Sequence, residues 1–318
     1  INILLQGDRQ QTVRTILFSL SFLWYFIILS VKVLHMNANW LLVDTPKAAQ
    51  RASDHLRQAV ILGIDTEYDS FRYFREKLCL IQIYTPFVTY VLDATVNLDL
   101  SFLAEPFQNR SVVKILHAAD NDIRLLKRDY GFEFHNIFDT HRAAMLLGFR
   151  QLSLDKIIKE FLGVELQKSK KMQRSRWDAR PLLAEQLEYA VQDVTLLPAL
   201  YERQKNFLHE KSLDGQADEA FAKIAAANWQ EREFDRRGYV KIKGYHALAH
   251  DQKELFKKLY VWRYERAKEA NCAVFMFLPD EKLTALAQKQ NKDNLQNILS
   301  PEQYRLYRAD LERLFQPG

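Results

Sequence analysis

The chain has 318 residues, 48% of them hydrophobic, and a formal net charge of +5. This length exceeds the usual size of one domain, so we expect two domains with apolar cores, and the composition excludes a largely disordered chain. Its two cysteines, Cys79 and Cys272, lack metal-ligand spacing. That pattern excludes a cysteine metal site and favours a reducing, cytoplasmic compartment.

An uncharged run covers residues 15–31 near the N-terminus. As a helix it reaches roughly 25 Å, slightly less than the ~30 Å hydrocarbon core of a bilayer. Arg14 and Lys32 flank it on both sides, so flanking charge predicts no orientation. Met36 opens a stretch typical of a soluble domain, and we favour upstream or non-native sequence over a membrane anchor for residues 1–35.

Positive charge is concentrated toward the C-terminus. Residues 241–318 hold 14 Lys/Arg and 10 Asp/Glu, whereas residues 36–240 hold 28 and 29. This distribution indicates an acidic, metal-holding catalytic part followed by a part that grips nucleic acid. Solvated faces of an ordinary protein give similar counts, so charge alone does not decide the partner.

The first elements after Met36 are a strand, a helix and three strands. The helix follows Thr45-Pro46, a helix-start signal, and Thr85-Pro86 separates two apolar runs as in a hairpin. We therefore expect an antiparallel meander of the first strands. The predicted ranges are a strand at 40–44, a helix at 46–58, a strand that begins with the apolar run 59–62 and carries Asp65, and strands at 78–84 and 88–92.

The next elements alternate between helix and strand. The expected order is β-β-β-α-β-α, which predicts an α/β fold in which a mixed sheet has helices on both faces. The predicted ranges are helices at 100–107, 118–130, 142–147, 154–161 and 181–200, and strands at 112–117 and 137–140.

Two carboxylates lie in the stretch 63–68, which closes the apolar run 59–62. Asp65 and Glu67 stand two residues apart, which places them on one face of a strand. Neighbouring acids at such a position are costly unless a cation lies between them, and oxygen ligands suit Mg²⁺ or Mn²⁺. A solvated strand end is the alternative, so the motif depends on partners further along the chain.

Three later residues supply those partners. Asp122 lies on the helix that follows strand 112–117. Tyr189 and Asp193 stand four residues apart on the predicted helix 181–200, so they share one helical face.

Basic residues dominate the loop at 167–180, which holds six Lys/Arg and one Asp. A solvated loop is one interpretation, and beside a metal site the loop could instead follow a nucleic-acid backbone. The predicted nucleic-acid contacts are Lys170, Lys171, Arg174 and Trp177, together with Arg263 on a C-terminal helix; Trp177 is expected to pack or to stack on bases.

These motifs, in this order, resemble the DEDD superfamily of 3′-to-5′ exonucleases in its tyrosine-bearing branch. The motifs are IDTE at 64–67, HAADND at 117–122 and YAVQD at 189–193. More specifically, the chain resembles the ribonuclease D family, through LCLIQI at 78–83, FDT at 138–140 and residues 177–190. Residues 242–244, 255–268 and 277–283 resemble an HRDC domain, a helical nucleic-acid-binding module.

The resemblance implies a ribonuclease H-like mixed sheet followed by a small all-α HRDC-like domain. It assigns residues 36–208 to the exonuclease, 209–240 to a helical linker and 241–318 to the HRDC-like domain. Two departures bear on substrate grip and preference. Tyr68 stands where phenylalanine is common, and one HRDC-like module is present where the family often has two.

The resemblance also implies two divalent ions, Mg²⁺ or Mn²⁺. Asp65 would bridge them, Glu67 and Asp193 would complete the nucleophile-side site, and Asp122 would hold the leaving-group-side ion through water. Such ions stabilise the attacking and leaving oxygens of a phosphodiester, and Tyr189 would orient or deprotonate the attacking water. The implied products are nucleoside monophosphates released from RNA 3′ ends, with tRNA precursors as substrate and no obligatory protein partner.

Three neighbouring polar residues are interpreted as structural. His117 is expected to be a hydrogen-bonded core histidine, Asp120 to point away from the face of Asp122, and Asp139 to act as a turn or cap residue.

Two rival functions remain, besides a membrane-tethered form of the nuclease, which depends entirely on residues 15–31. A DNA exonuclease would use the same carboxylates, since sugar discrimination depends on contacts to the 2′-OH. A non-catalytic RNA-binding adaptor has no need for four intact acids, which argues against it.

Overall fold

The computed structural model describes residues 39–166, 170–288 and 295–316, so the apolar run at 15–31 lies outside the described residues. The chain divides into two compact units. The first holds the residues up to Glu67 and Leu78–Trp229, and the second holds Tyr68–Lys77 and Gln230–Gly318. Within the described ranges, every helix is too short or too polar to cross a bilayer.

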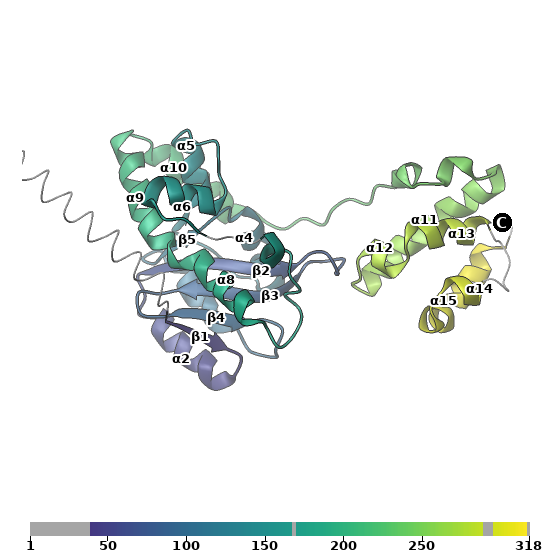
Figure 1. Cartoon of the computed structure of the whole chain (residues 1–318), viewed down its shortest axis with the longest axis horizontal. Coiled ribbons are helices and arrows are strands. Elements are labelled where there is room, and N and C mark those ends of the chain that lie inside the picture. Colours follow the sequence, from purple (N-terminus) through teal and green to yellow (C-terminus); the bar gives the residue numbers. More distant parts are fainter. Residues whose placement is uncertain (1–38, 167–169, 289–294, 317–318) are drawn as a thin grey trace, which may run out of the picture. The chain divides into compact units, whose positions relative to one another are not determined.

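A six-stranded sheet forms the centre of the first unit (Figure 1). Its order is β1-β4-β3-β2-β5-β6. The pairs β1/β4, β2/β5 and β5/β6 are parallel, whereas β3/β4 is antiparallel, which confirms the predicted mixed sheet. The strands are β1 (Trp40–Val43), β2 (Ile61–Asp69), β3 (Lys77–Tyr84), β4 (Thr89–Asp93), β5 (Val113–Leu116) and β6 (Ile137–Asp139).

The predicted antiparallel meander is correct for one pair and wrong for β1. The β3–β4 hairpin forms where Thr85-Pro86 predicts it, and the Thr85 backbone N–H donates to the Val88 carbonyl at 3.1 Å. In contrast, β1 pairs in parallel with β4 at the sheet edge. A parallel neighbour requires a crossover, and α2 (Pro46–Leu56) supplies it by carrying the chain from β1 to the central β2.

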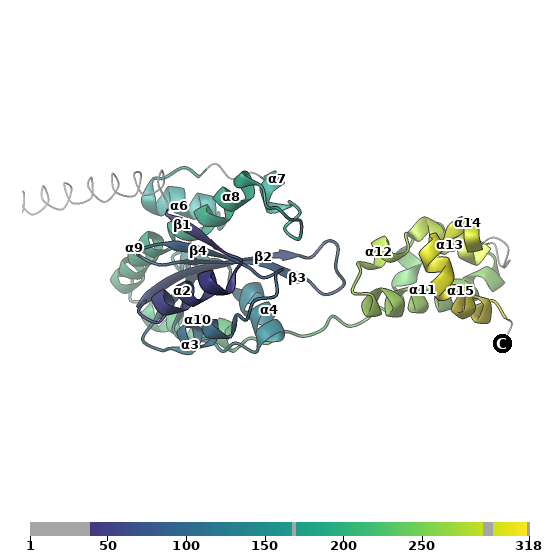
Figure 2. The same cartoon turned by 90° about the horizontal axis from the view of Figure 1, so that it is seen from below.

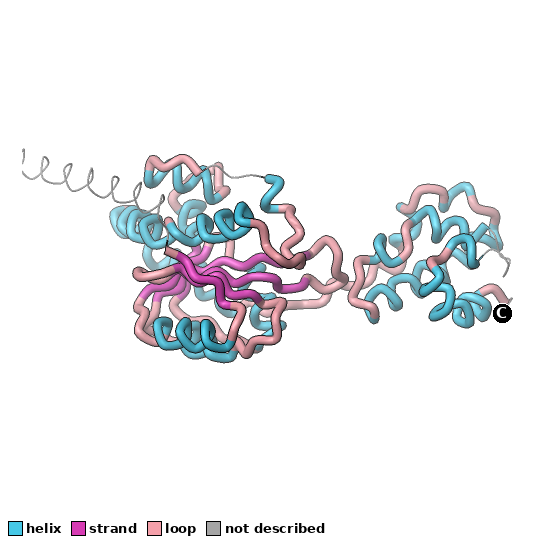
Figure 3. Tube along the Cα trace, turned by 60° about the horizontal axis from the view of Figure 1, so that its bottom comes forward, coloured by secondary structure: helices cyan, strands magenta, loops and turns pink. Residues whose placement is uncertain are grey.

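Helices lie on both faces of this sheet (Figure 3), and Figure 2 shows α8 on one face and α2 on the other. The predicted N-cap of α2 is confirmed, since the Thr45 side chain accepts a hydrogen bond from the Ala48 N–H. The remaining helices are η1 (Ser101–Leu103), α3 (Ala104–Gln108), α4 (Asp120–Tyr130), α5 (Thr140–Leu146), α6 (Leu154–Leu162), α7 (Lys170–Gln173), α8 (Ala184–Thr195), α9 (Leu197–Glu210) and α10 (Asp214–Ala226).

The single helix predicted at 181–200 is two helices. The first, α8, ends at Thr195 with Leu196 as its C-cap, and α9 begins at Leu197 with a proline in its first turn. Pro198 lacks a backbone N–H and is tolerated in the first turn but not in a helix interior. Pro198 lies inside the predicted range 181–200, and it accounts for the break between α8 and α9.

Part of the core joins α8 to the sheet. Val191 and Ala190 of α8 are buried against β3 and β4. Apolar burial is the main favourable term in folding, so this packing fixes α8 over the strands. The buried members of this cluster are Cys79, Leu80, Val91, Met172, Trp177, Tyr189, Ala190 and Val191.

The second unit is helical. Its core gathers around Phe256, Leu259 and Trp262 of α11, against residues of α13 and α15. The linker predicted at 209–240 is divided between the units, because α10 packs on α5 and β6 whereas the residues from Gln230 belong to the second unit. The elements are η2 (Gly238–Lys241), η3 (Tyr245–Ala247), α11 (His250–Glu269), α12 (Val274–Phe277), α13 (Asp280–Gln288), α14 (Leu295–Ile298) and α15 (Pro301–Leu314).

Candidate active site

Strand β2 places Asp65 and Glu67 on one side of the sheet. The residues before them are apolar and buried, with Leu62 and Ile64 fully inaccessible, so this part of β2 is held in the core. Successive side chains of a strand alternate between faces. Asp65 and Glu67 accordingly share a face and are half-buried, as the two-residue spacing predicts.

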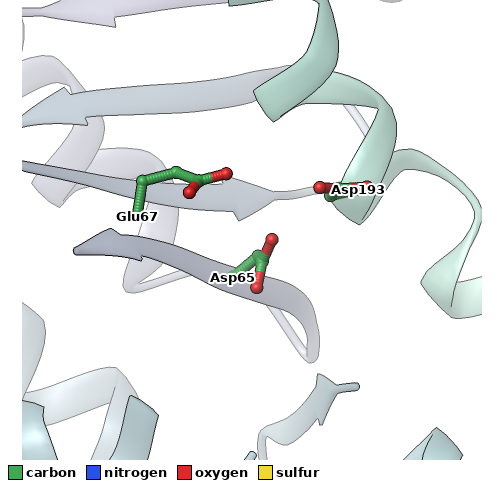
Figure 4. Close-up of side chains that lie close together, drawn as sticks. All are labelled: Asp65, Glu67 and Asp193. Atoms are coloured by element: carbon green, nitrogen blue, oxygen red, sulfur yellow. The ribbon is translucent and has the colours of Figure 1, made fainter. Parts of the chain in front are cut away.

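Helix α8 brings a third carboxylate to the same place. Asp193 is 6% exposed, and one oxygen each of Asp65, Glu67 and Asp193 lie within 4.8 Å of one another. Figure 4 shows Asp193 of the helix beside the two side chains of the strand. We call these three residues the carboxylate cluster. Its all-oxygen donor set fits a hard divalent cation, and three close acids carry a repulsion that a cation removes.

A glycine permits the close approach of α8 to β2. A Cβ at Gly63 would lie 3.0 Å from the Val194 carbonyl oxygen and 3.2 Å from Cβ of Tyr84. Val194 adjoins Asp193 on α8, so Gly63 sets the separation between the two elements that carry the cluster. Sequence analysis did not single out this residue, although a glycine inside a strand often marks close backbone approach.

We expect Gly63→Ala to destabilise the protein by about 1–3 kcal/mol, since an inserted methyl group must displace α8. The displacement also separates Asp193 from Asp65 and should weaken Mg²⁺ binding. Thermal unfolding and calorimetric metal titration measure the two effects. Gly215→Ala is the matched control, because a Cβ at Gly215 of α10 meets nothing within 4 Å; equal behaviour of the two variants would contradict this role of Gly63.

Tyr189 lies one turn before Asp193 and is 9% exposed. Burial raises its pKa well above its ordinary value, and the charges of Asp193, Glu67 and Asp65 raise the pKa further. A hydrogen bond to Asp193 acts in the same direction. In the metal-free chain the phenol is therefore protonated and its single O–H donates to Asp193, which leaves the phenol oxygen to accept a hydrogen bond from a water molecule. This arrangement suits a group that orients water more than one that removes a proton.

Asp122 lies near β2 but contacts a different residue. It lies in the first turn of α4, and it accepts a hydrogen bond from the hydroxyl of Thr66. Thr66 alternates with Asp65 and Glu67 along the strand, and the carboxylate cluster does not include Asp122. Burial raises the pKa of Asp122 to about 6, although the Thr66 hydroxyl acts to lower this pKa.

The shifted pKa of Asp122 predicts a conflict between stability and activity. Because its pKa is higher in the folded chain than in the unfolded chain, its charge opposes folding above about pH 6 and costs nothing below about pH 4. We expect Asp122→Asn to raise the free energy of unfolding by about 1–3 kcal/mol at pH 7 without metal, and to lower activity. Thermal unfolding in EDTA from pH 4 to 8 measures the gain in stability. A gain that persists at pH 4 would contradict the buried Asp122 charge as its cause.

The three polar residues interpreted as structural have structural partners. The Nδ1 of His117 lies 2.9 Å from the Thr140 hydroxyl, and Asp120 pairs with Arg142 at 3.1 Å. Asp139 is the N-cap of α5 and accepts hydrogen bonds from the Ala119 and Arg142 N–H groups, which confirms its prediction as a cap.

Comparison with known proteins identifies the first unit. Residues 41–208 match the family model described as 3′-5′ exonuclease, over more than half of the chain. The chain belongs to this exonuclease family. Residues 252–312 match the HRDC domain model, so the exonuclease is followed by an HRDC domain.

Two curated relatives and one solved structure resemble this exonuclease. The exosome complex component 10 homolog of Drosophila melanogaster is 29% identical over 82% of this chain and 29% of its own. Ribonuclease D of Acidiphilium cryptum is 30% identical over 78% of this chain and 62% of its own. The chain thus spans less than two thirds of either. The crystal structure of the catalytic core of RRP6 from Trypanosoma brucei shares the fold, with a TM-score of 0.77 and 24% identity over 88% of this chain and 79% of that one.

The described part of the basic segment, residues 170–180, includes the short helix α7. Lys170 begins α7, and Lys171 and Arg174 are exposed. Binding to the phosphate backbone of a nucleic acid requires such exposure. Trp177, in contrast, is 2% exposed and its ring lies 6.0 Å from that of Tyr189. Burial leaves Trp177 no face for a base, so it packs against Tyr189, and its prediction as a nucleic-acid contact is corrected.

Arg263 requires the same correction in the second unit. It is 4% exposed, and its guanidinium donates to the Leu278 carbonyl at 3.0 Å and to the Asp280 carboxylate at 2.7 Å. Both partners bind one guanidinium nitrogen inside the helical unit, so Arg263 is a structural residue of the HRDC domain.

An ion pair that sequence analysis missed fixes the segment that carries Trp177. Arg180 donates to the buried Asp93 at the end of β4 and, at 2.8 Å, to the Trp177 carbonyl oxygen. Burial acts to raise the pKa of Asp93, but the hydrogen bonds from Arg180 and Thr95 lower this pKa below its ordinary value. In the sequence, Arg180 is one of several basic residues in the run 167–180. No local sequence pattern distinguishes Arg180 from its solvated neighbours.

Proposed function

We propose that this chain is a metal-dependent 3′-to-5′ exoribonuclease that releases nucleoside 5′-monophosphates. The convergence of Asp65, Glu67 and Asp193 within 4.8 Å carries the proposal. Membership of the 3′-5′ exonuclease family supports the reaction and its direction. RNA as the substrate is supported by similarity to the A. cryptum relative, which is named ribonuclease D.

The acidic side chains and Tyr189 have different roles in the proposed hydrolysis. Asp65, Glu67 and Asp193 would hold two divalent ions together with Asp122, and Mg²⁺ or Mn²⁺ suits their oxygen donors. Bound there, the ions supply charge stabilisation to the attacking and leaving oxygens. The Tyr189 hydroxyl orients the attacking water by a hydrogen bond. Trp177 packs against the Tyr189 ring, and Asp193 fixes the Tyr189 hydroxyl by a hydrogen bond.

The choice of RNA over DNA is tested with matched substrates. Single-stranded RNA and DNA of one sequence, labelled at the 5′ end, are digested side by side with Mg²⁺, with Mn²⁺ and with EDTA. We expect shortening of RNA in either metal, slower shortening of DNA, and neither reaction in EDTA. Faster digestion of DNA would favour the repair or proofreading alternative, which uses the same carboxylates.

Processing of tRNA precursors, action without a protein partner and a cytoplasmic location remain predictions. The D. melanogaster relative is named as a component of the exosome complex, and we do not extend that assembly to this chain. A precursor of tRNA with a 3′ extension, compared with an unstructured RNA of equal length, tests the substrate. Preferential removal of the extension would support tRNA processing, and equal rates would argue for a general nuclease.

A further inference from the structure

Exposed apolar side chains gather on one surface of the second unit. Phe71 is 61% exposed, and Phe275 and Met276 of α12 are 48% and 47% exposed. The rings of Phe71 and Phe275 lie 5.0 Å apart and are tilted by 58°. We call Phe71, Phe275 and Met276 the aromatic step. Among the described residues nine large apolar side chains are exposed; the rings of two of them, Phe71 and Phe275, pair here, and a third, Met276, follows Phe275 in α12. Surface apolar residues are usually scattered.

Hydrogen bonds connect the two chain segments that form the aromatic step. Phe71 comes from the turn after β2 and Phe275 from the helical domain, 204 residues apart in sequence. The Ala273 N–H donates to the Arg72 carbonyl at 2.9 Å, and the Arg75 N–H donates to the Asn271 side-chain oxygen at 2.9 Å. Two backbone segments so joined hold the rings at a fixed spacing.

Aromatic packing beside the step reinforces this junction. Phe74 packs against Tyr264 of α11, with ring centroids 5.1 Å apart, and Tyr264 stacks on Phe234 at 4.0 Å. Phe74 is among the residues packed against the core of the unit. Phe74 therefore anchors the segment, and Phe71 stays exposed beside it.

Charge favours a nucleic acid as the occupant of this surface. The second unit holds 20 Lys/Arg and 15 Asp/Glu, whereas the first holds 25 of each, so the whole excess of +5 lies in the unit that carries the step. Exposed aromatic rings in a basic setting are typical of proteins that bind single strands, since every base offers a face for stacking. A protein partner would require no such excess.

We propose that the aromatic step of Phe71 and Phe275 stacks unpaired bases of single-stranded RNA. The inference rests on the proposed function for the choice of RNA, and it identifies a substrate-binding surface outside the carboxylate cluster. Bases in a duplex are stacked on each other and cannot use the step, so it selects unpaired strands. Stacking reads no sequence, which suits a nuclease that acts on every nucleotide in turn.

Binding of a short fluorescent oligoadenylate to the full chain tests the step. EDTA keeps the RNA intact, so affinity is measured whether or not the chain hydrolyses RNA, and failure of the step is distinct from failure of the proposed reaction. Because one stacked base contributes ~1–3 kcal/mol, Phe71→Ala should weaken binding by roughly 5–150-fold. Phe275→Ala should act similarly, and Phe71→Tyr, which keeps the ring, should bind as the parent does.

Three controls make the test specific. Phe87→Ala removes a ring of the first unit that is 79% exposed, more than Phe71 or Phe275, and should leave affinity unchanged. The slope of affinity against salt should stay constant in Phe71→Ala, since stacking releases no counterions. An oligonucleotide with abasic units should bind parent and variant equally. Unchanged oligoadenylate affinity in both alanine variants, or an equal loss on the abasic strand, would overturn the proposal.

Discussion

Replacing Asp65 by asparagine should reduce hydrolysis of RNA by more than about 10³-fold, which exceeds the ~10–100-fold typical of a residue that merely supports a metal ligand. Asp65 belongs to the carboxylate cluster, whose oxygens lie within 4.8 Å of one another. The change removes one anionic donor and keeps the size of the side chain. RNA binding should persist, because the excess positive charge lies in the second unit. Single-turnover digestion and RNA binding measured in parallel separate the two effects.

Asp120→Asn is the matched control for Asp65→Asn. Asp120 is also an aspartate near the site, but its carboxylate pairs with Arg124 and Arg142. Exposed ion pairs contribute little to stability, so this variant should hydrolyse RNA at nearly the parental rate. Normal turnover by Asp65→Asn, or an equal loss in both variants, would contradict the metal-holding role of the cluster.

Replacing Tyr189 by phenylalanine should lower the turnover rate by about 10²–10⁴-fold, the range typical of a positioned proton-transfer or water-orienting group. The ring that packs against Trp177 survives the change, and only the hydroxyl beside Asp193 is lost. Metal affinity, RNA affinity and thermal stability should therefore stay near the parental values. Pre-steady-state digestion gives the rate of the chemical step.

A purely structural role for Tyr189 predicts a different result. Loss of one hydroxyl contact from a packed tyrosine costs about 0.5–1.5 kcal/mol of stability and leaves the reaction intact. Turnover within about twofold of the parent, whatever the change in melting temperature, would assign Tyr189 to packing and leave water orientation to other groups.

Local periodicity predicted the parts of the site that lie on single elements. The two-residue spacing of Asp65 and Glu67 and the four-residue spacing of Tyr189 and Asp193 are properties of a strand and a helix. Their convergence joins residues more than 120 positions apart, which no local pattern reports. The family resemblance supplied that link in the sequence analysis.

Burial of polar and aromatic residues was the feature that sequence patterns did not predict. Trp177 and Arg263 sit in basic stretches typical of nucleic-acid contacts, yet each is buried against partners contributed by other elements. Likewise, the Thr66 hydroxyl that binds Asp122 and the approach of Val194 to Gly63 arise from packing between elements. The parallel position of β1 had the same origin, since strand order depends on the whole sheet.

The direction and metal dependence of RNA digestion test the central claim most directly. One single-stranded RNA is labelled at the 5′ end in one sample and at the 3′ end in another, and both are digested with Mg²⁺ or with EDTA. We expect a ladder of progressively shorter 5′-labelled chains, immediate release of the 3′ label as a nucleoside 5′-monophosphate, and no reaction in EDTA. Release of the 5′ label first, internal cleavage, or digestion that continues in EDTA would contradict it.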